Sequence, residues 1–174
     1  NDGSYYYGQF LNDPDAFQKM HKETESFIAN LVPGTSNLEY GPTFSPSSLD
    51  LIDNFLEKAS SRGIYVVGFL PPYSQLLREK VLKANNQFTK SMQSLPVILR
   101  NRFNKYGFSF YDFSDISLIK SSDKELIDIV HGSEKMYARI MLHISRTDIK
   151  ISPFVDQTTL KERVDNSKNN LKIF

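Results

Sequence analysis

Apolar residues fill two short stretches of the chain and recur at helical spacing in several longer ones. Residues 64–70 are β-branched and almost wholly apolar, and residues 108–113 are mainly aromatic. Short apolar runs of this kind are typical of strands that helices cover on both faces. Apolar spacing predicts helices over residues 13–32, 46–62, 75–106 and 134–144. Helix, glycine turn and buried strand in this order predict a βαβ architecture with a parallel sheet.

Local signals refine these boundaries. Ser45 and Ser133 stand where an N-cap is expected, one before Pro46 and one before the last amphipathic helix. Pro96 lies inside residues 75–106 and predicts a kink or a restart there, because proline loses a helix hydrogen bond. Residues 33–46 are rich in Gly, Pro, Ser and Thr, which predicts a long loop, more simply a connector than a lid.

Composition narrows the class of protein. The 174 residues are 40% hydrophobic, enough to bury the core of a single α/β domain over residues 1–174. Lys and Arg number 21 against 20 Asp and Glu, without long runs of either sign, so no nucleic-acid partner is expected. The absence of cysteine excludes disulfides, thiolate chemistry and Cys-based zinc sites, and leaves the compartment open.

The start of the chain and its apolar runs bear on membrane insertion, secretion and completeness. No run reaches the roughly 18 apolar residues of a membrane helix, and the first residues lack the pattern of a signal peptide. The chain starts at Asn1 without an initiator Met, so we expect a fragment or a trimmed chain with sequence missing upstream. Residues 5–7 are three tyrosines, which more simply pack on the domain than stack on a ligand.

Asp128 and His131 are the clearest candidates for chemistry. They lie three residues apart in a segment that opens into a helix, so both side chains can face one side. An imidazole acts as a general base most effectively when a carboxylate accepts the hydrogen bond from its other ring nitrogen. A structural pair is the commoner use of this spacing. No third ligand lies at metal-binding spacing, so we expect neither a metal nor a cofactor.

Three further residues are candidates for contact with substrate. Tyr73 and Ser74 follow Pro71 and Pro72 at the end of the first predicted strand, and Asp112 lies at the end of the second. Ligands bind beyond the carboxyl ends of strands in open α/β sheets. Loops that merely end a strand, and aspartates that cap such loops, are the alternative use of these residues.

The order of these features resembles the C-terminal half of SGNH (GDSL-type) hydrolases, over residues 47–144. The resemblance rests on a buried strand ending in Pro71-Pro72, a long helical pair, an aromatic strand ending at Asp112, and Asp-x-x-His-Gly-Ser-Glu over residues 128–134. The last block is closest to SGNH-like proteins of bacterial envelope polysaccharide pathways, some of which transfer acetyl groups. The resemblance implies a three-layer, flavodoxin-like parallel sheet flanked by helices and incomplete at the N-terminus.

The same resemblance implies a division of the chain and a function. Residues 1–46 would form an arm, a helix and a long loop, residues 47–145 the SGNH-like core, and residues 146–174 a C-terminal extension. His131 and Asp128 would complete a catalytic triad with a serine, in an esterase or O-acyl(acetyl)transferase that acts on a small acyl ester or glycan. A membrane-bound acyl-transfer partner and a bacterial cell-envelope location follow from the resemblance alone; it does not define the oligomeric state.

The chain departs from the family at the nucleophile. It contains no Gly-Asp-Ser block after a first strand, and no glycine and asparagine blocks for an oxyanion hole are identifiable. Either the nucleophile lies upstream in a longer protein, or the chain is an inactive relative, or the match is accidental; we favour the first. The chain alone is then expected to be inactive. The alternative function is a non-catalytic α/β binding or interaction module.

Overall fold

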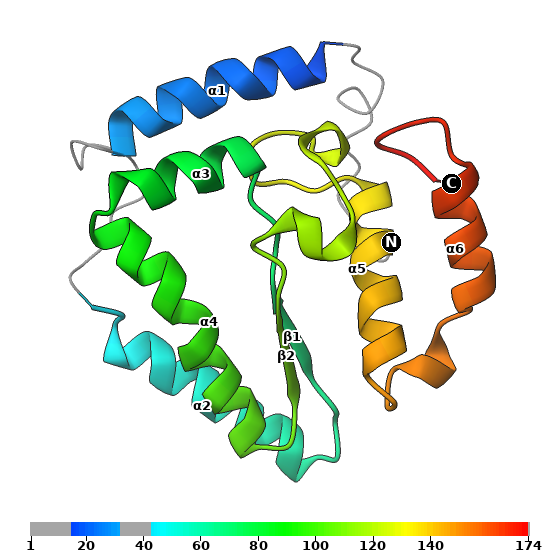
Figure 1. The fold of residues 1–174 in the computed structure, drawn as a ribbon. Helices are drawn as coiled ribbons and strands as arrows, with labels where there is room; N and C mark the ends of the chain where they lie inside the picture. Colours follow the sequence, from blue (N-terminus) through cyan, green and yellow to red (C-terminus); the bar gives the residue numbers. More distant parts are fainter. Residues whose placement is uncertain (1–14, 32–42, 174) are drawn as a thin grey trace, which may run out of the picture.

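The computed structural model describes residues 15–31 and 43–173 (Figure 1). The predicted Tyr5 to Tyr7 arm and most of the predicted loop over residues 33–46 lie outside this part of the chain. In chain order the elements are α1 (Ala16–Leu31), α2 (Pro46–Ser61), β1 (Val67–Leu70), α3 (Gln75–Ala84), α4 (Gln87–Lys105), β2 (Ser109–Asp112), η2 (Ile116–Ile119), η3 (Asp123–Glu125), α5 (Glu134–Thr147), η4 (Ser152–Phe154) and α6 (Gln157–Asn166).

The fold is a helix-rich mixture of α and β structure around one small parallel sheet. Strands β1 and β2 pair in parallel, from Val67 opposite Ser109 to Leu70 opposite Asp112. Helices α3 and α4 form the crossover between them, so the predicted βαβ unit is confirmed. Both strands are shorter than predicted. Ladder pairing begins only at Val67 and Ser109. The earlier residues Tyr65, Val66 and Phe108 lie outside the ladder and pack in the cluster with Phe103 and Phe110.

Helices cover both faces of the two strands with apolar side chains. Figure 1 shows α4 on one side of the strands and α5 on the other. Successive side chains of a strand point to opposite faces. Phe110 therefore packs with Phe103 of α4 and Leu56 of α2, whereas Tyr111 and Val67 pack with the cluster on the α5 side. The α5 cluster is built from Leu77, Val81, Phe113, Ile116, Ile119, Leu126, Ile129, Met136, Ile140 and Ile144.

The caps of the helices agree with the sequence in two places and differ in one. The Ser45 side chain accepts a hydrogen bond from Ser48 N–H, and Ser133 caps α5 in the same way, so both predicted N-caps are confirmed. The predicted restart at Pro96 is wrong, because Pro96 is buried within a continuous α4. The break lies instead at Asn85, which ends α3 in a left-handed conformation with φ of 46°, and Asn86 caps α4.

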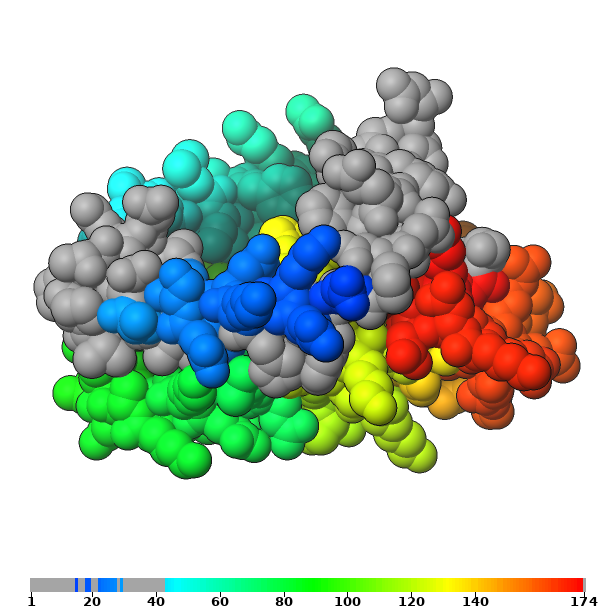
Figure 2. Space-filling model, turned by 90° about the horizontal axis from the view of Figure 1, so that it is seen from above, coloured from blue at the N-terminus to red at the C-terminus, as the bar shows by residue number. Residues whose placement is uncertain are grey.

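Two peripheral helices complete the described part of the chain. Helix α6 packs on α5 through Val164, Ala138 and Leu142, so the C-terminal extension contributes its own apolar contact. Helix α1 contacts α3, and its Phe27 packs against the α5 cluster. In Figure 2, which views the molecule from above, α1 lies across the face nearest the viewer. Across residues 15–31 and 43–173, none of the helices combines the length and apolar character needed to cross a bilayer.

Candidate functional site

Asp128 and His131 form a direct side-chain contact. Asp128 Oδ2 lies 2.5 Å from His131 Nδ1, a short hydrogen-bond contact between a carboxylate and an imidazole. The second oxygen, Oδ1, accepts hydrogen bonds from Val130 N–H at 2.8 Å and from His131 N–H at 2.7 Å. One carboxylate thus fixes both the backbone and the ring of the histidine. The His131 side chain is 51% exposed and that of Asp128 27%, so the pair lies at the surface with its carboxylate inward.

The surroundings of Asp128 favour its ionised form. Burial raises the pKa of its carboxyl, but hydrogen bonds from Val130 N–H, the His131 ring and His131 N–H outweigh burial and leave the pKa below its ordinary value of 3.8. Asp128 is therefore a carboxylate at neutral pH, able to accept the Nδ1–H of the imidazole. This acceptor selects the tautomer in which Nε2 is the basic nitrogen.

The segment that carries the pair is a tight loop between η3 and α5. Ile127 N–H donates to His131 O at 2.8 Å, and Leu126 and Gly132 form an isolated antiparallel bridge. Gly132 lies close against Met136: a Cβ there would lie 2.9 Å from the sulfur of Met136, so that side chain would have to shift. Because Met136 is fully buried in the α5 cluster, the loop is anchored directly to the core.

The loop lies at the carboxyl end of β1. Ser74 N–H donates to Ile129 O at 3.0 Å, which ties the residue four positions past β1 to the residue next to Asp128. The two chains that leave the sheet also stay together, because Phe113 N–H donates to Leu70 O and Tyr73 bridges to Asp115 in parallel. The structure therefore brings Asp128 and His131 to the same end of the sheet as Tyr73, Ser74 and Asp112.

Ser74 occupies a structural position at that end. Its side chain is fully buried, and its Oγ accepts a hydrogen bond from Leu77 N–H at 3.1 Å as the N-cap of α3. Asp123 caps the same helix from η3: Oδ1 accepts from Gln75 N–H at 2.6 Å and Oδ2 from Leu76 N–H at 3.3 Å. Burial and capping count against contact of the Ser74 hydroxyl with a substrate.

Tyr73 and Asp112 lie close to one another in the partly buried wall of this end. Burial raises the pKa of the Tyr73 hydroxyl, and the negative charge of Asp112 raises it further, so Tyr73 is a neutral hydrogen-bonding group at physiological pH. Asp112 Oδ1 accepts from Ser114 N–H at 3.0 Å, the loop-capping use of aspartate that the sequence left open. A role in binding substrate stays a prediction for both.

A partly buried ion pair behind the loop was not anticipated from the sequence. Arg139 of α5 donates through Nε and a terminal nitrogen to both oxygens of Glu125, at 2.8 and 3.0 Å, and Ser121 Oγ also donates to this carboxylate. Ser133 N–H donates to Glu125 O, so the same residue holds the start of α5. Arg139 lies 14 residues from Glu125, and Gln75 and Leu76 lie far from Asp123 along the chain, so no local spacing in the sequence indicated these partners.

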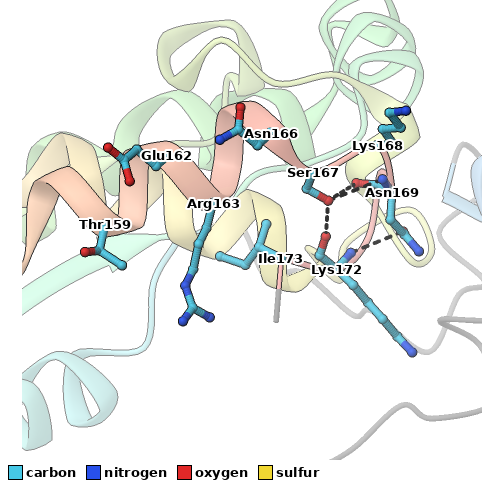
Figure 3. Close-up of a pocket in the computed structure, with 9 residues that line it drawn as sticks. All are labelled: Thr159, Glu162, Arg163, Asn166, Ser167, Lys168, Asn169, Lys172 and Ile173. Atoms are coloured by element: carbon cyan, nitrogen blue, oxygen red, sulfur yellow. Dashed lines mark hydrogen bonds between the residues drawn. The ribbon is translucent and has the colours of Figure 1, made fainter.

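Two hollows lie elsewhere on the described surface, and the five predicted site residues line neither of them. One, of about 670 Å³, is formed by polar side chains of α6 and the C-terminal segment; Figure 3 shows Ser167 donating to Asn169 and Lys172 carbonyls within it. The other, of about 390 Å³, lies between η2, α5 and α6. Among the described residues, no three His, Asp or Glu side chains are grouped to hold a metal ion.

Comparison with known proteins assigns no relative to this chain. It matches no family model, no curated protein and no solved structure.

Proposed function

We propose that the chain is the C-terminal part of an SGNH-like serine esterase or O-acyl(acetyl)transferase that acts on an acylated glycan or a similar ester. The observation that carries the proposal is the 2.5 Å contact between Asp128 Oδ2 and His131 Nδ1. In this proposal His131 is the general base, Asp128 orients it, and the nucleophilic serine comes from sequence upstream of Asn1. The acceptor is water in an esterase and a glycan hydroxyl in a transferase.

The geometry of the pair suits this chemistry. With Nδ1 engaged by Asp128, His131 Nε2 takes the proton of the serine as its Oγ attacks the ester carbonyl. Collapse of the tetrahedral intermediate releases the alcohol, which takes that proton from Nε2. The acceptor hydroxyl then gives its proton to Nε2 as it attacks the acyl-serine. Collapse of this second intermediate breaks the bond to the serine, releases the acid or new ester, and returns the proton from Nε2 to the serine Oγ. The pair needs no rearrangement of its own loop, because backbone N–H groups already hold Asp128 in place.

We also propose that the two strands belong to a three-layer, flavodoxin-like sheet. Such a sheet needs further parallel strands beside β1 and β2, which sequence upstream of Asn1 would supply. Two observations support this: the two described strands are parallel, and helices cover both of their faces. Parallel sheets with helices on both faces are characteristic of α/β folds with several strands.

The test compares this chain with the full-length product of its gene. Full-length protein should hydrolyse p-nitrophenyl acetate, and this chain alone should not. Asp128→Asn and His131→Ala should each lower kcat in the full-length protein by about 10³- to 10⁴-fold, because either change removes the oriented base. Asp156→Asn, a matched change at the exposed N-cap of α6, should leave kcat unchanged.

Three outcomes would count against the proposal. Ester hydrolysis by this chain alone would show that no upstream serine is needed. Activity that survives Asp128→Asn and His131→Ala would remove the pair from the mechanism. A full-length protein with the pair intact and no transfer or hydrolysis would favour the alternative function, a binding or interaction module without catalysis.

A further inference from the structure

The end of the molecule opposite the Asp128–His131 pair exposes large apolar side chains on neighbouring turns. Ile149 is 86% and Phe154 84% exposed in the turn between α5 and α6, and Ile64 is 54% exposed before β1. Isolated exposed apolar residues are ordinary on protein surfaces, but a group of them on adjoining turns marks an interaction surface. In Figure 1 these turns lie at the lower end, and the loop with Asp128 lies at the upper end.

The turn between α5 and α6 is held rigidly by hydrogen bonds. Ser152 N–H donates to Asp148 O at 2.9 Å, and Phe154 N–H donates to Ile151 O at 3.0 Å. The side chain of Gln157 donates to Ser145 O and to Ser152 Oγ, both at 3.1 Å, which closes the turn from the α6 side. This ordered backbone therefore holds the Ile149 and Phe154 side chains outward.

Contacts with Tyr65 join the turns into one surface. The Tyr65 hydroxyl donates to Asp148 Oδ2 at 2.8 Å, and Lys150 Nζ lies 4.2 Å from the centre of the Tyr65 ring. Asp148 is buried, so its carboxylate faces the protein, while the Lys150 ammonium remains beside the exposed turn. Ile64, adjacent to Tyr65, consequently shares an end of the molecule with Ile149.

Basic residues also lie at this end of the molecule. The helices α2, α4 and α5 all end at this end of the molecule, and each carries basic residues in its last turn. Arg102 is not counted, because it pairs with Asp53. The basic residues at these helix ends and in the adjoining turns are Lys58, Arg62, Lys105, Arg146 and Lys150. The carboxylates at this end are Glu57, Asp156 and the buried Asp148, and Arg146 also faces Asp165 of α6, so the five cations still outnumber the carboxylates among the described residues there.

We propose that this end of the molecule binds the surface of a bilayer that contains anionic lipids, with the Ile149 and Phe154 side chains inserted at the headgroup level. Exposed apolar side chains at an end of the molecule that also carries Lys and Arg match the interface of an anionic bilayer, where the basic groups meet the lipid headgroups. The inference does not rest on the proposed function. It implies that the Asp128–His131 end faces away from the bilayer, toward water.

The experiment measures partition of the chain onto large unilamellar vesicles by co-sedimentation. Wild-type chain should bind vesicles containing about one third phosphatidylglycerol and bind phosphatidylcholine vesicles weakly, with binding that falls as salt rises. Ile149→Ser together with Phe154→Ser should lower partition about tenfold or more, because insertion of both side chains is lost. The matched control is Leu51→Ser with Phe55→Ser, at 69% and 57% exposure on α2, which should leave partition unchanged.

A second pair of variants tests the charges. Arg62→Gln with Lys150→Gln should lower partition onto anionic vesicles several-fold and weaken its salt dependence. Circular dichroism of every variant establishes that it is folded, which the high exposure of Ile149 and Phe154 favours. Absence of wild-type binding to anionic vesicles overturns the proposal, as does equal loss of binding in the α2 control. A dimer by sedimentation equilibrium that Ile149→Ser with Phe154→Ser dissolves would assign this end to a second copy instead.

Discussion

At Asp128, three hydrogen bonds oppose the cost of burying a carboxylate, and their balance sets a testable pH dependence. Because the folded pKa lies below the ordinary 3.8, the unfolded chain takes up the proton first as the pH falls. The stabilisation is complete above the unfolded pKa, near pH 5 and higher, and is lost as the pH falls through the folded pKa. We expect Asp128→Asn to lower the free energy of unfolding by about 1–2 kcal/mol at pH 6, and the difference to shrink steadily as the pH falls below 3.8 toward the folded pKa.

Urea unfolding from pH 2.5 to 7 measures this difference, and a carbon-13 titration of Asp128 measures the folded pKa directly. Asp156→Asn is a weak comparison here, because the pKa of Asp156 is also lowered, by hydrogen bonds from Thr159. Leu51→Ser, which removes an exposed apolar side chain, is the better control and should show the same difference at every pH. A difference between wild type and Asp128→Asn that is constant with pH would contradict the prediction.

Residue by residue, the sequence could identify the contacts whose partners are local. The Asp128–His131 contact joins residues three apart in one loop, so spacing alone allowed it to be predicted. The position of Ser74 could not be foreseen in the same way. Its burial depends on Ile129, whose carbonyl accepts from Ser74 N–H, and the distance between these residues along the chain leaves no periodic signal.

Helix α3 starts at the site, and its start depends on an aspartate from another element. Asp123 accepts from Gln75 and Leu76 N–H groups, while Ser74 accepts from Leu77 N–H. The first N–H groups of a helix have no partner within it. Asp123→Ala should therefore lower the free energy of unfolding by about 1–2 kcal/mol, and Asp123→Asn, which keeps one acceptor oxygen, by less than half of that.

Hydrogen exchange locates this effect. In Asp123→Ala the amides of Gln75 and Leu76 should exchange faster, because their acceptors are gone, and Thr159 N–H should be unaffected. Asp156→Ala removes the acceptor of Thr159 N–H in α6 and should give the reverse pattern. Unchanged protection of Gln75 and Leu76 in Asp123→Ala would show that η3 does not hold the start of α3.

Among the elements, local capping signals placed the helix starts, and tertiary packing moved the other boundaries. Ser45 and Ser133 act on the N–H groups three residues ahead, so their role is written in the adjacent sequence. The restart predicted at Pro96 was wrong because proline disfavours but does not forbid a helix interior. Helix α4 continues through Pro96, which is buried. The break at Asn85 needed the left-handed conformation that asparagine tolerates better than most residues.

In the molecule as a whole, the pattern of apolar residues predicted parallel strands between helices but could not define the width of the sheet. Helices on both faces follow from strands that are apolar on both sides, such as residues 67–70. Sheet width depends on how many strands pair, and the apolar pattern of two strands does not report how many others lie beside them. The same limit applies to the site: the Asp128–His131 contact could be predicted, but a residue that would act with it could not be identified from this sequence.

The close approach of α4 to β1 gives a test of this layered packing. A Cβ on Gly68 would lie 2.4 Å from the Phe103 ring and 2.9 Å from the Phe110 ring, so β1 and α4 must separate or the rings must move. We expect Gly68→Ala to lower the free energy of unfolding by about 2–3 kcal/mol, measured by urea unfolding. Phe103→Leu should recover part of this loss in the double variant, because it removes the ring atoms that clash.

Gly107→Ala is the matched control for this cycle. A Cβ at Gly107 meets nothing within 4 Å, but φ is +72°, so the substitution should cost about 1 kcal/mol through backbone strain alone. Phe103→Leu should not relieve that strain, and the two changes should add. Additive losses for Gly68→Ala and Phe103→Leu as well would mean that α4 does not rest on β1 at Gly68. If Phe103→Leu reduces the free-energy loss of Gly68→Ala but not that of Gly107→Ala, the contact between the Phe103 ring and the Gly68 backbone fixes α4 on the sheet.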